Sequence, residues 1–86
     1  MDLLITSEGR ICHVMSGSID ACIVNWEWYR ENYPDVTGHF DCHHYRCTMA
    51  EDGNWIVMRF CENLEPPRYY QSLKKALIFM ETHIPC

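Results

Sequence analysis

Cysteine and histidine, two residue types that bind zinc at neutral pH, are concentrated in one short segment of the sequence. Five of the nine residues from 39 to 47 are cysteine or histidine. On a strand, Cys42 and His44 would point to the same side, and a hairpin between residues 45–49 and 55–60 would put Cys61 opposite His44. With His39 as the nearest fourth ligand, these residues form a candidate zinc site in a zinc-stabilised structural or adaptor module.

The spacing of this cluster favours a simpler interpretation. Structural zinc sites usually show paired Cys-x-x-Cys motifs, which the cluster lacks. A strand would also direct His43 and Cys47 to the side opposite Cys42. We therefore expect Cys47 to be a small buried residue and the adjacent histidines, His43 and His44, to lie near a strand end. The sequence predicts no cofactor, with zinc as the alternative.

The cysteines also raise the question of a thiol enzyme, which needs a cysteine activated by a nearby base. Cys12 and His13 are adjacent on a predicted strand and point to opposite sides. Cys42 and His44 would stand on a flat ribbon without oxyanion donors. The sequence contains no phosphate-binding loop, no G-x-S-x-G and no H-E-x-x-H. We expect a non-enzymatic protein whose cysteines are reduced.

Acidic residues on the first predicted helix give the strongest indication of function. Glu27 and Glu31 follow Asp20 by seven and eleven positions, which places all three within about 20° of one line along the helix. Val24 and Trp28 lie beside this line, away from the expected core. An acidic line alone is typical of a solvated helix face. Large apolar residues rimmed by charge are typical of protein interfaces, so the sequence predicts a partner-binding surface here.

A second candidate surface lies on the hairpin predicted for residues 45–49 and 55–60. With Asp52 and Gly53 as a two-residue loop, one side of the ribbon would face the core. That side would carry Tyr45, Cys47, Met49, Ile56, Met58 and Phe60. The other side would carry Arg46, Trp55 and Arg59, which could hold a phosphate and stack a base. Two arginines are few in an acidic chain, so we expect this surface to contact a protein and not nucleic acid.

Turn and cap residues predict the elements that position these side chains. Strands are predicted at residues 3–6, 11–15, 45–49 and 55–60, and helices at residues 19–32 and 73–84. Gly9 marks the first turn, Ser18 caps the first helix, and Pro34 ends it. Ser72 or Gln71 caps the second helix. The predicted fold is α+β with the order ββαββα, in which two helices pack on one face of an antiparallel sheet.

Composition and charge limit the class of protein. Of the 86 residues, 48% are apolar and 13% aromatic, which is typical of a globular chain rather than a disordered one. We expect a single domain over residues 1–86, with a pseudo-repeat of residues 1–37 and 38–86 as an open alternative. No apolar run approaches the roughly 18 residues that span a membrane, and Asp2 stands where a signal peptide has basic residues. We therefore expect a cytoplasmic protein without a membrane partner.

In its small size, its net charge of −5 and its lack of catalytic motifs, the chain resembles the proteins with which phages and mobile elements block host defence, anti-CRISPR inhibitors among them. The resemblance implies an inhibitor of a host macromolecular machine, acting in the host cytoplasm by occlusion or by mimicry of nucleic-acid phosphate. The partner would be another protein, such as one that itself binds nucleic acid. Alternatively, the same apolar surface would join two copies of this chain in a homodimer.

Overall fold

The computed structural model describes residues 1–59 and 66–83, which form an α+β fold. The elements follow the order ββαββββα: β1 (Asp2–Ser7), β2 (Arg10–Ser16), α1 (Ile19–Asn32), β3 (Thr37–Cys42), β4 (Tyr45–Met49), β5 (Trp55–Arg59), β6 (Arg68–Tyr70) and α2 (Leu73–Thr82). The α+β class agrees with the prediction from the sequence.

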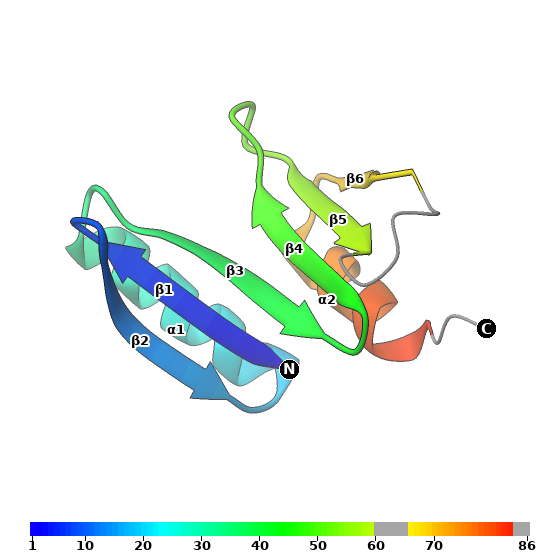
Figure 1. Ribbon diagram of the computed structural model, residues 1–86, viewed down its shortest axis with the longest axis horizontal. Coiled ribbons are helices and arrows are strands. Elements are labelled where there is room, and N and C mark those ends of the chain that lie inside the picture. Colours follow the sequence, from blue (N-terminus) through cyan, green and yellow to red (C-terminus); the bar gives the residue numbers. More distant parts are fainter. Residues whose placement is uncertain (60–65, 84–86) are drawn as a thin grey trace.

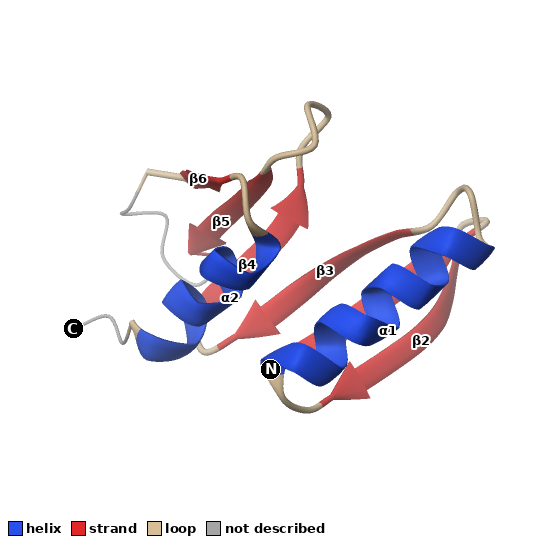
Figure 2. Ribbon diagram, turned by 180° about the vertical axis from the view of Figure 1, so that it is seen from behind, coloured by secondary structure: helices blue, strands red, loops and turns tan. Residues whose placement is uncertain are grey.

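These strands join one antiparallel sheet in the order β2-β1-β3-β4-β5-β6. Both helices lie behind the sheet in Figure 1 and in front of it in Figure 2, so they cover the same face. Alternate side chains of the strands point toward the helices and form the core with them. The buried core residues are Leu3, Ile5, Cys22, Trp26, Phe40, Tyr45, Cys47, Trp55, Val57, Ala76, Leu77 and Met80.

Serine side chains begin both helices: Ser18 is the predicted cap of α1, and Ser72 is one of the two residues predicted to cap α2. The hydroxyl of Ser18 accepts a hydrogen bond from the Ala21 amide at 3.2 Å, and that of Ser72 accepts one from the Lys75 amide at 3.4 Å. Each bond satisfies an amide that has no partner inside the helix. The range of α1, Ile19–Asn32, is the predicted one. The helix ends there because Pro34 follows its C-cap residue, Tyr33. The second helix was predicted to reach residue 84, but α2 ends at Thr82, because its C-cap residue His83 has extended backbone.

The predicted order ββαββα is wrong because it lacks β3 and β6. No strand was predicted at residues 37–42, but β3 pairs with β1 along one edge and with β4 along the other. The sequence of β3 contains a glycine and an aspartate, and only Phe40 is buried, so its local strand signal is weak. β6 has three residues and directly follows two prolines. Tertiary pairing forms both strands.

The register predicted for β4 and β5 is wrong by one residue. Cys47 pairs with Val57, whereas the prediction paired it with Met58. Side chains alternate along a strand, so this shift moves every side chain of β5 to the opposite face of the sheet. Val57 is therefore in the core, and Met58 is exposed. Phe60, which was predicted to face Tyr45, lies outside the described residues.

The loop between these strands explains the shift. The Ala50 amide donates a hydrogen bond to the Asn54 carbonyl at 2.7 Å, which leaves three residues in the loop instead of two. Gly53 is the third of them and has a φ of 86°, in the left-handed region that glycine adopts at low cost. A turn followed by a left-handed glycine is a common three-residue hairpin connection. The Asp-Gly signal thus located the hairpin, but it did not determine the loop length.

A carboxylate joins the loop after α1 to the first hairpin. Asp35 accepts a hydrogen bond from the Ser7 hydroxyl at 2.6 Å and another from the Glu8 amide. These two bonds favour the charged carboxylate and lower the pKa of Asp35 below its usual range. Glu8 lies in the turn between β1 and β2 with a φ of 55°, so the bonds also hold a backbone conformation that is unusual for glutamate.

Asp35→Asn is expected to destabilise the protein at neutral pH and to have less effect in acid. A carboxylate whose pKa is lowered by folding stabilises the fold above the pKa of the unfolded chain, about 3.9. That contribution is lost as the pH falls through the folded-state pKa. Urea midpoints measured from about pH 7 to about pH 2 check this. The exposed Glu51→Gln serves as a control that should follow the wild type, and an Asp35→Asn deficit that stays constant with pH would contradict the assignment.

Candidate protein-binding surface

The outer side of α1 carries all five residues that the sequence singled out on this helix. Cys22 and Trp26 are buried on its inner side, against the sheet. The opposite side holds Asp20, Val24, Glu27, Trp28 and Glu31, and all five are exposed. Val24 is 64% exposed and Trp28 is 52% exposed, although both are large and apolar. We call these five residues the α1 face.

Acidic charge on the α1 face is concentrated toward the C-terminal half of the helix. Asp20, in the first turn, lies 3.5 Å from the ammonium group of Lys74 on α2. This exposed pair offsets the charge at one end of the face. Glu27 and Glu31 are one helical turn apart and are exposed, so their charges add on the same side as Trp28.

Two tyrosines extend the apolar part of the α1 face. The ring of Trp28 lies 5.0 Å from that of Tyr29 and 6.2 Å from that of Tyr33, and the two tyrosine rings stack at 5.6 Å. Helical spacing places both tyrosines on the side of the helix that carries Trp26, but Tyr33 is 42% exposed. It is the C-cap residue, with extended backbone, so the helical spacing no longer applies to it. Pro34 was the signal in the sequence that could have shown this.

The second candidate surface, on β4 and β5, is not formed. Trp55 is 6% exposed and packs in the core against Trp26 and Phe40, with ring centroids 5.8 and 5.9 Å apart. Arg59 lies on the same side of β5 as Trp55, whereas Arg46 lies on the uncovered face of the sheet. The one-residue register shift is the reason that the three side chains do not meet.

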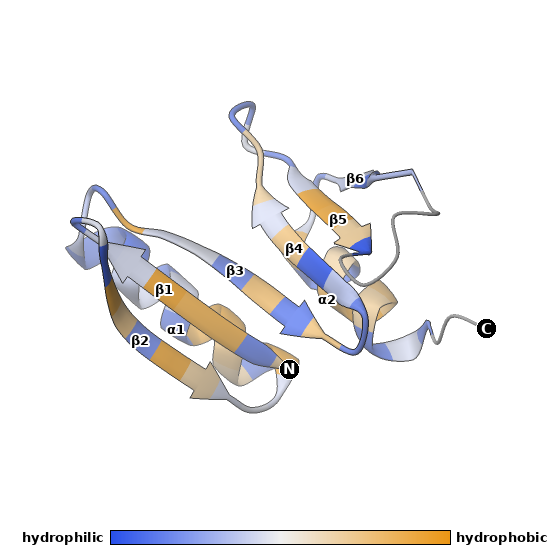
Figure 3. Cartoon of the chain, in the orientation of Figure 1, coloured by the Kyte–Doolittle hydropathy of each residue, from blue (hydrophilic) through white to orange (hydrophobic). Residues whose placement is uncertain are grey.

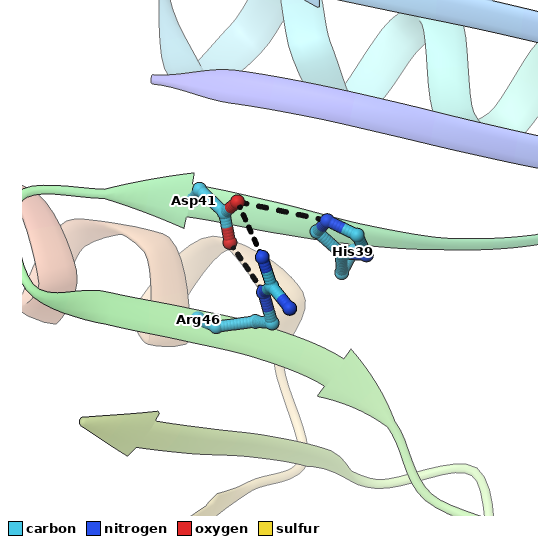
Figure 4. A network of polar contacts seen from close by, with 3 residues as sticks. All are labelled: His39, Asp41 and Arg46. Atoms are coloured by element: carbon cyan, nitrogen blue, oxygen red, sulfur yellow. Dashed lines mark hydrogen bonds and ion pairs between the residues drawn. The ribbon is translucent and has the colours of Figure 1, made fainter. Parts of the chain in front are cut away.

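Arg46 belongs instead to a polar network on the uncovered face of the sheet, shown in Figure 4. Its guanidinium donates two hydrogen bonds to Asp41, at 2.8 and 3.1 Å. His39 Nε2 lies 3.6 Å from the same carboxylate. Burial lowers the pKa of His39, partly opposed by Asp41 and reinforced by Arg46, so the imidazole is neutral at neutral pH.

The predicted zinc ligands do not converge in the described part of the chain. Cys42 points toward the core side of β3, and His39 is three positions earlier, so it points to the uncovered face. His44 belongs to the turn between β3 and β4 and not to a strand. Cys61 lies outside the described residues. Among residues 1–59 and 66–83, no group of three or more histidine, cysteine, aspartate or glutamate side chains could hold a metal ion.

Burial keeps the core thiols protonated. It raises the pKa of Cys47 to about 12 and also raises the pKa of Cys22 and of Cys42. A thiolate is the reactive form of cysteine, and a raised pKa makes it scarce at neutral pH. Cys47 is thus the small buried residue that the sequence predicted.

The apolar character of the uncovered face of the sheet is a feature that the sequence interpretation missed. Strands β1, β2 and β5 are rich in apolar residues (Figure 3), but the helices cover one face only. Val14, Met58 and Tyr69 point away from the helices and are 64%, 44% and 67% exposed. The correct register of β5 would have indicated an apolar uncovered face, because it places Val57 in the core and Met58 on the uncovered face.

Comparisons with known proteins found no relative of this chain. The chain matches no family model, no curated protein and no solved structure. In the described residues, no helix has the length and apolar character needed to cross a membrane. The candidate site therefore rests on the geometry and charge of this chain alone.

Proposed function

We propose that the protein is a non-enzymatic protein-binding module whose contact surface is the α1 face. The observation that carries this proposal is the exposure of Val24 and Trp28 beside Glu27 and Glu31 on the outer side of one helix. Tryptophan is among the residues that contribute most to binding energy at interfaces, and acidic neighbours select a basic partner surface.

The finer proposal is inhibition. A protein machine that binds nucleic acid has a basic groove, and an acidic helix with an exposed tryptophan can occupy such a groove and exclude the nucleic acid. This is the mode of action that the resemblance to anti-defence proteins implies, anti-CRISPR inhibitors included. In this proposal the protein acts in the cytoplasm, which is the host cytoplasm if a phage encodes it, and it binds a protein rather than nucleic acid or a membrane.

A pull-down from bacterial lysate at about 50 mM and about 150 mM salt tests the proposal. We expect one stoichiometric protein that binds the tagged wild type more weakly at the higher salt. The triple variant Asp20→Lys, Glu27→Lys and Glu31→Lys should reduce capture at least tenfold, because reversed charges repel a basic groove. Trp28→Ala should have a similar effect through lost apolar contact. Excess heparin, a polyanion, should displace the partner.

A second triple variant controls for net charge. Glu8→Lys, Glu51→Lys and Glu81→Lys change the net charge by the same amount, at exposed positions away from the α1 face. This control should capture the partner as the wild type does. Equal loss with both triple variants would show that only net charge matters, and equal capture by both would exclude the α1 face as the contact surface. Circular dichroism of each variant verifies folding.

A further inference from the structure

A cavity opens where β3 and β4 separate. Their pairing runs from Cys42 and Tyr45 as far as His39 and Thr48, and it does not continue beyond that pair. The space between the diverging strand ends has a volume of about 320 Å³. The lining residues are Leu4, Thr6, Trp26, Val36, Thr37, Gly38, His39, Thr48 and Met49. A cavity of about 150 Å³ can hold a benzene ring, so this one has room for a substituted ring.

Gly38 allows the indole ring of Trp26 to line the cavity. A Cβ atom at position 38 would lie 2.7 Å from the Leu4 carbonyl oxygen and 3.1 Å from Cζ3 of Trp26. Glycine is therefore needed for β3 to approach both β1 and the indole this closely. The ring edge of Trp26 can then contact a molecule in the cavity.

An aromatic occupant would continue a packing pattern already present in the core. Trp26, Phe40 and Trp55 contact one another pairwise in edge-to-face geometry, with centroid distances from 5.8 to 6.3 Å. Edge-to-face pairs are favourable beyond the area that they bury. Trp26 is 2% exposed, so a ring in the cavity would meet only the edge of its indole, with Leu4 and Met49 as apolar walls.

One side of the cavity is polar. Thr6, Thr37 and Thr48 contribute hydroxyl groups, and His39 contributes a neutral imidazole. Its Nε2 faces Asp41, so Nδ1 is the nitrogen that can accept a hydrogen bond from a ligand. Apolar walls with a few hydrogen-bonding groups on one side are typical of ligand sites that fix the orientation of a ring.

We propose that this cavity binds a phenolic ring, with the ring against Trp26 and the hydroxyl group toward His39 and the threonines. The same chemistry occurs in free para-substituted phenols and in tyrosine side chains of a partner protein. The site is separate from the α1 face, so it does not depend on the function proposed above.

NMR titration with p-cresol, the side chain of tyrosine as a free molecule, tests the proposal. We expect saturable shifts of the Gly38 amide and the Trp26 indole resonances, with toluene at least fivefold weaker because it lacks the hydroxyl group. Thr48→Phe fills the cavity and should weaken p-cresol binding at least tenfold, whereas Thr82→Phe, exposed on α2, should leave it unchanged.

His39→Leu provides a second variant that leaves the cavity open. It should weaken p-cresol at least fivefold and leave toluene unchanged. The proposal is overturned if p-cresol shifts resonances elsewhere but not those of Gly38 and Trp26, if toluene binds as tightly as p-cresol, or if Thr48→Phe binds p-cresol like the wild type.

N-acetyl-tyrosine amide distinguishes the two sources of the phenolic ring, a free phenol and a tyrosine side chain of a partner protein. Binding equal to that of p-cresol assigns the site to tyrosine residues of a partner, and binding of p-cresol alone assigns it to free phenols.

Discussion

Trp55→Ala is expected to lower the free energy of unfolding by about 3–5 kcal/mol, as for other buried aromatic residues. Trp55 is 6% exposed and contacts Trp26 and Phe40, so alanine would leave a cavity between α1 and the sheet. A chain of this length has a total stability of only about 4–13 kcal/mol, so the loss is large. Urea unfolding followed by far-UV circular dichroism measures it.

Met58→Ala is the matched control for this prediction, because Met58 lies on the same strand and is 44% exposed on the other face. It should cost less than about 1 kcal/mol. The register predicted from the sequence would give the reverse order, with Met58 in the core and Trp55 in solvent. A larger loss for Met58→Ala than for Trp55→Ala would therefore contradict the observed pairing of β4 and β5.

Trp26→Ala is expected to cost about 3–5 kcal/mol as well. Trp26 is 2% exposed, and its ring is the contact through which α1 packs on Phe40 of β3 and Trp55 of β5. Its loss would remove the contacts of α1 with two strands at once. The same urea experiment measures the effect, and a loss below about 1 kcal/mol would contradict this role.

Trp28→Ala provides the comparison within the same helix. Trp28 is two positions from Trp26 and is 52% exposed, so the substitution should cost about 1 kcal/mol or less. The two substitutions therefore distinguish an effect on stability from an effect on partner binding. We expect Trp26→Ala to impair folding, and we expect Trp28→Ala to leave the fold intact while it impairs partner binding.

The helices could be predicted from local sequence because their signals are local. Ser18 and Ser72 accept hydrogen bonds from amides three residues later, and Pro34 ends the helical conformation just after α1. The α1 face could be predicted for the same reason, since the angle between Asp20 and Glu27 depends only on helix geometry.

The sheet could not be predicted to the same extent because its contacts are between distant segments. β3 has one buried residue and a weak strand pattern, yet it lies between β1 and β4 because both offer it hydrogen bonds. One additional residue in the loop around Gly53 reversed the faces of β5 and moved Trp55 from the predicted contact surface into the core.

By itself, the sequence determined the α+β class, both helix starts and the exposed acidic and apolar residues of α1, because these follow from composition and from interactions within a few residues. Only the tertiary structure decided the strand order, the register, the separation of Arg46 from Trp55 and the cavity beside Trp26. Each of these depends on how segments far apart in the chain pair and pack, which local spacing does not specify.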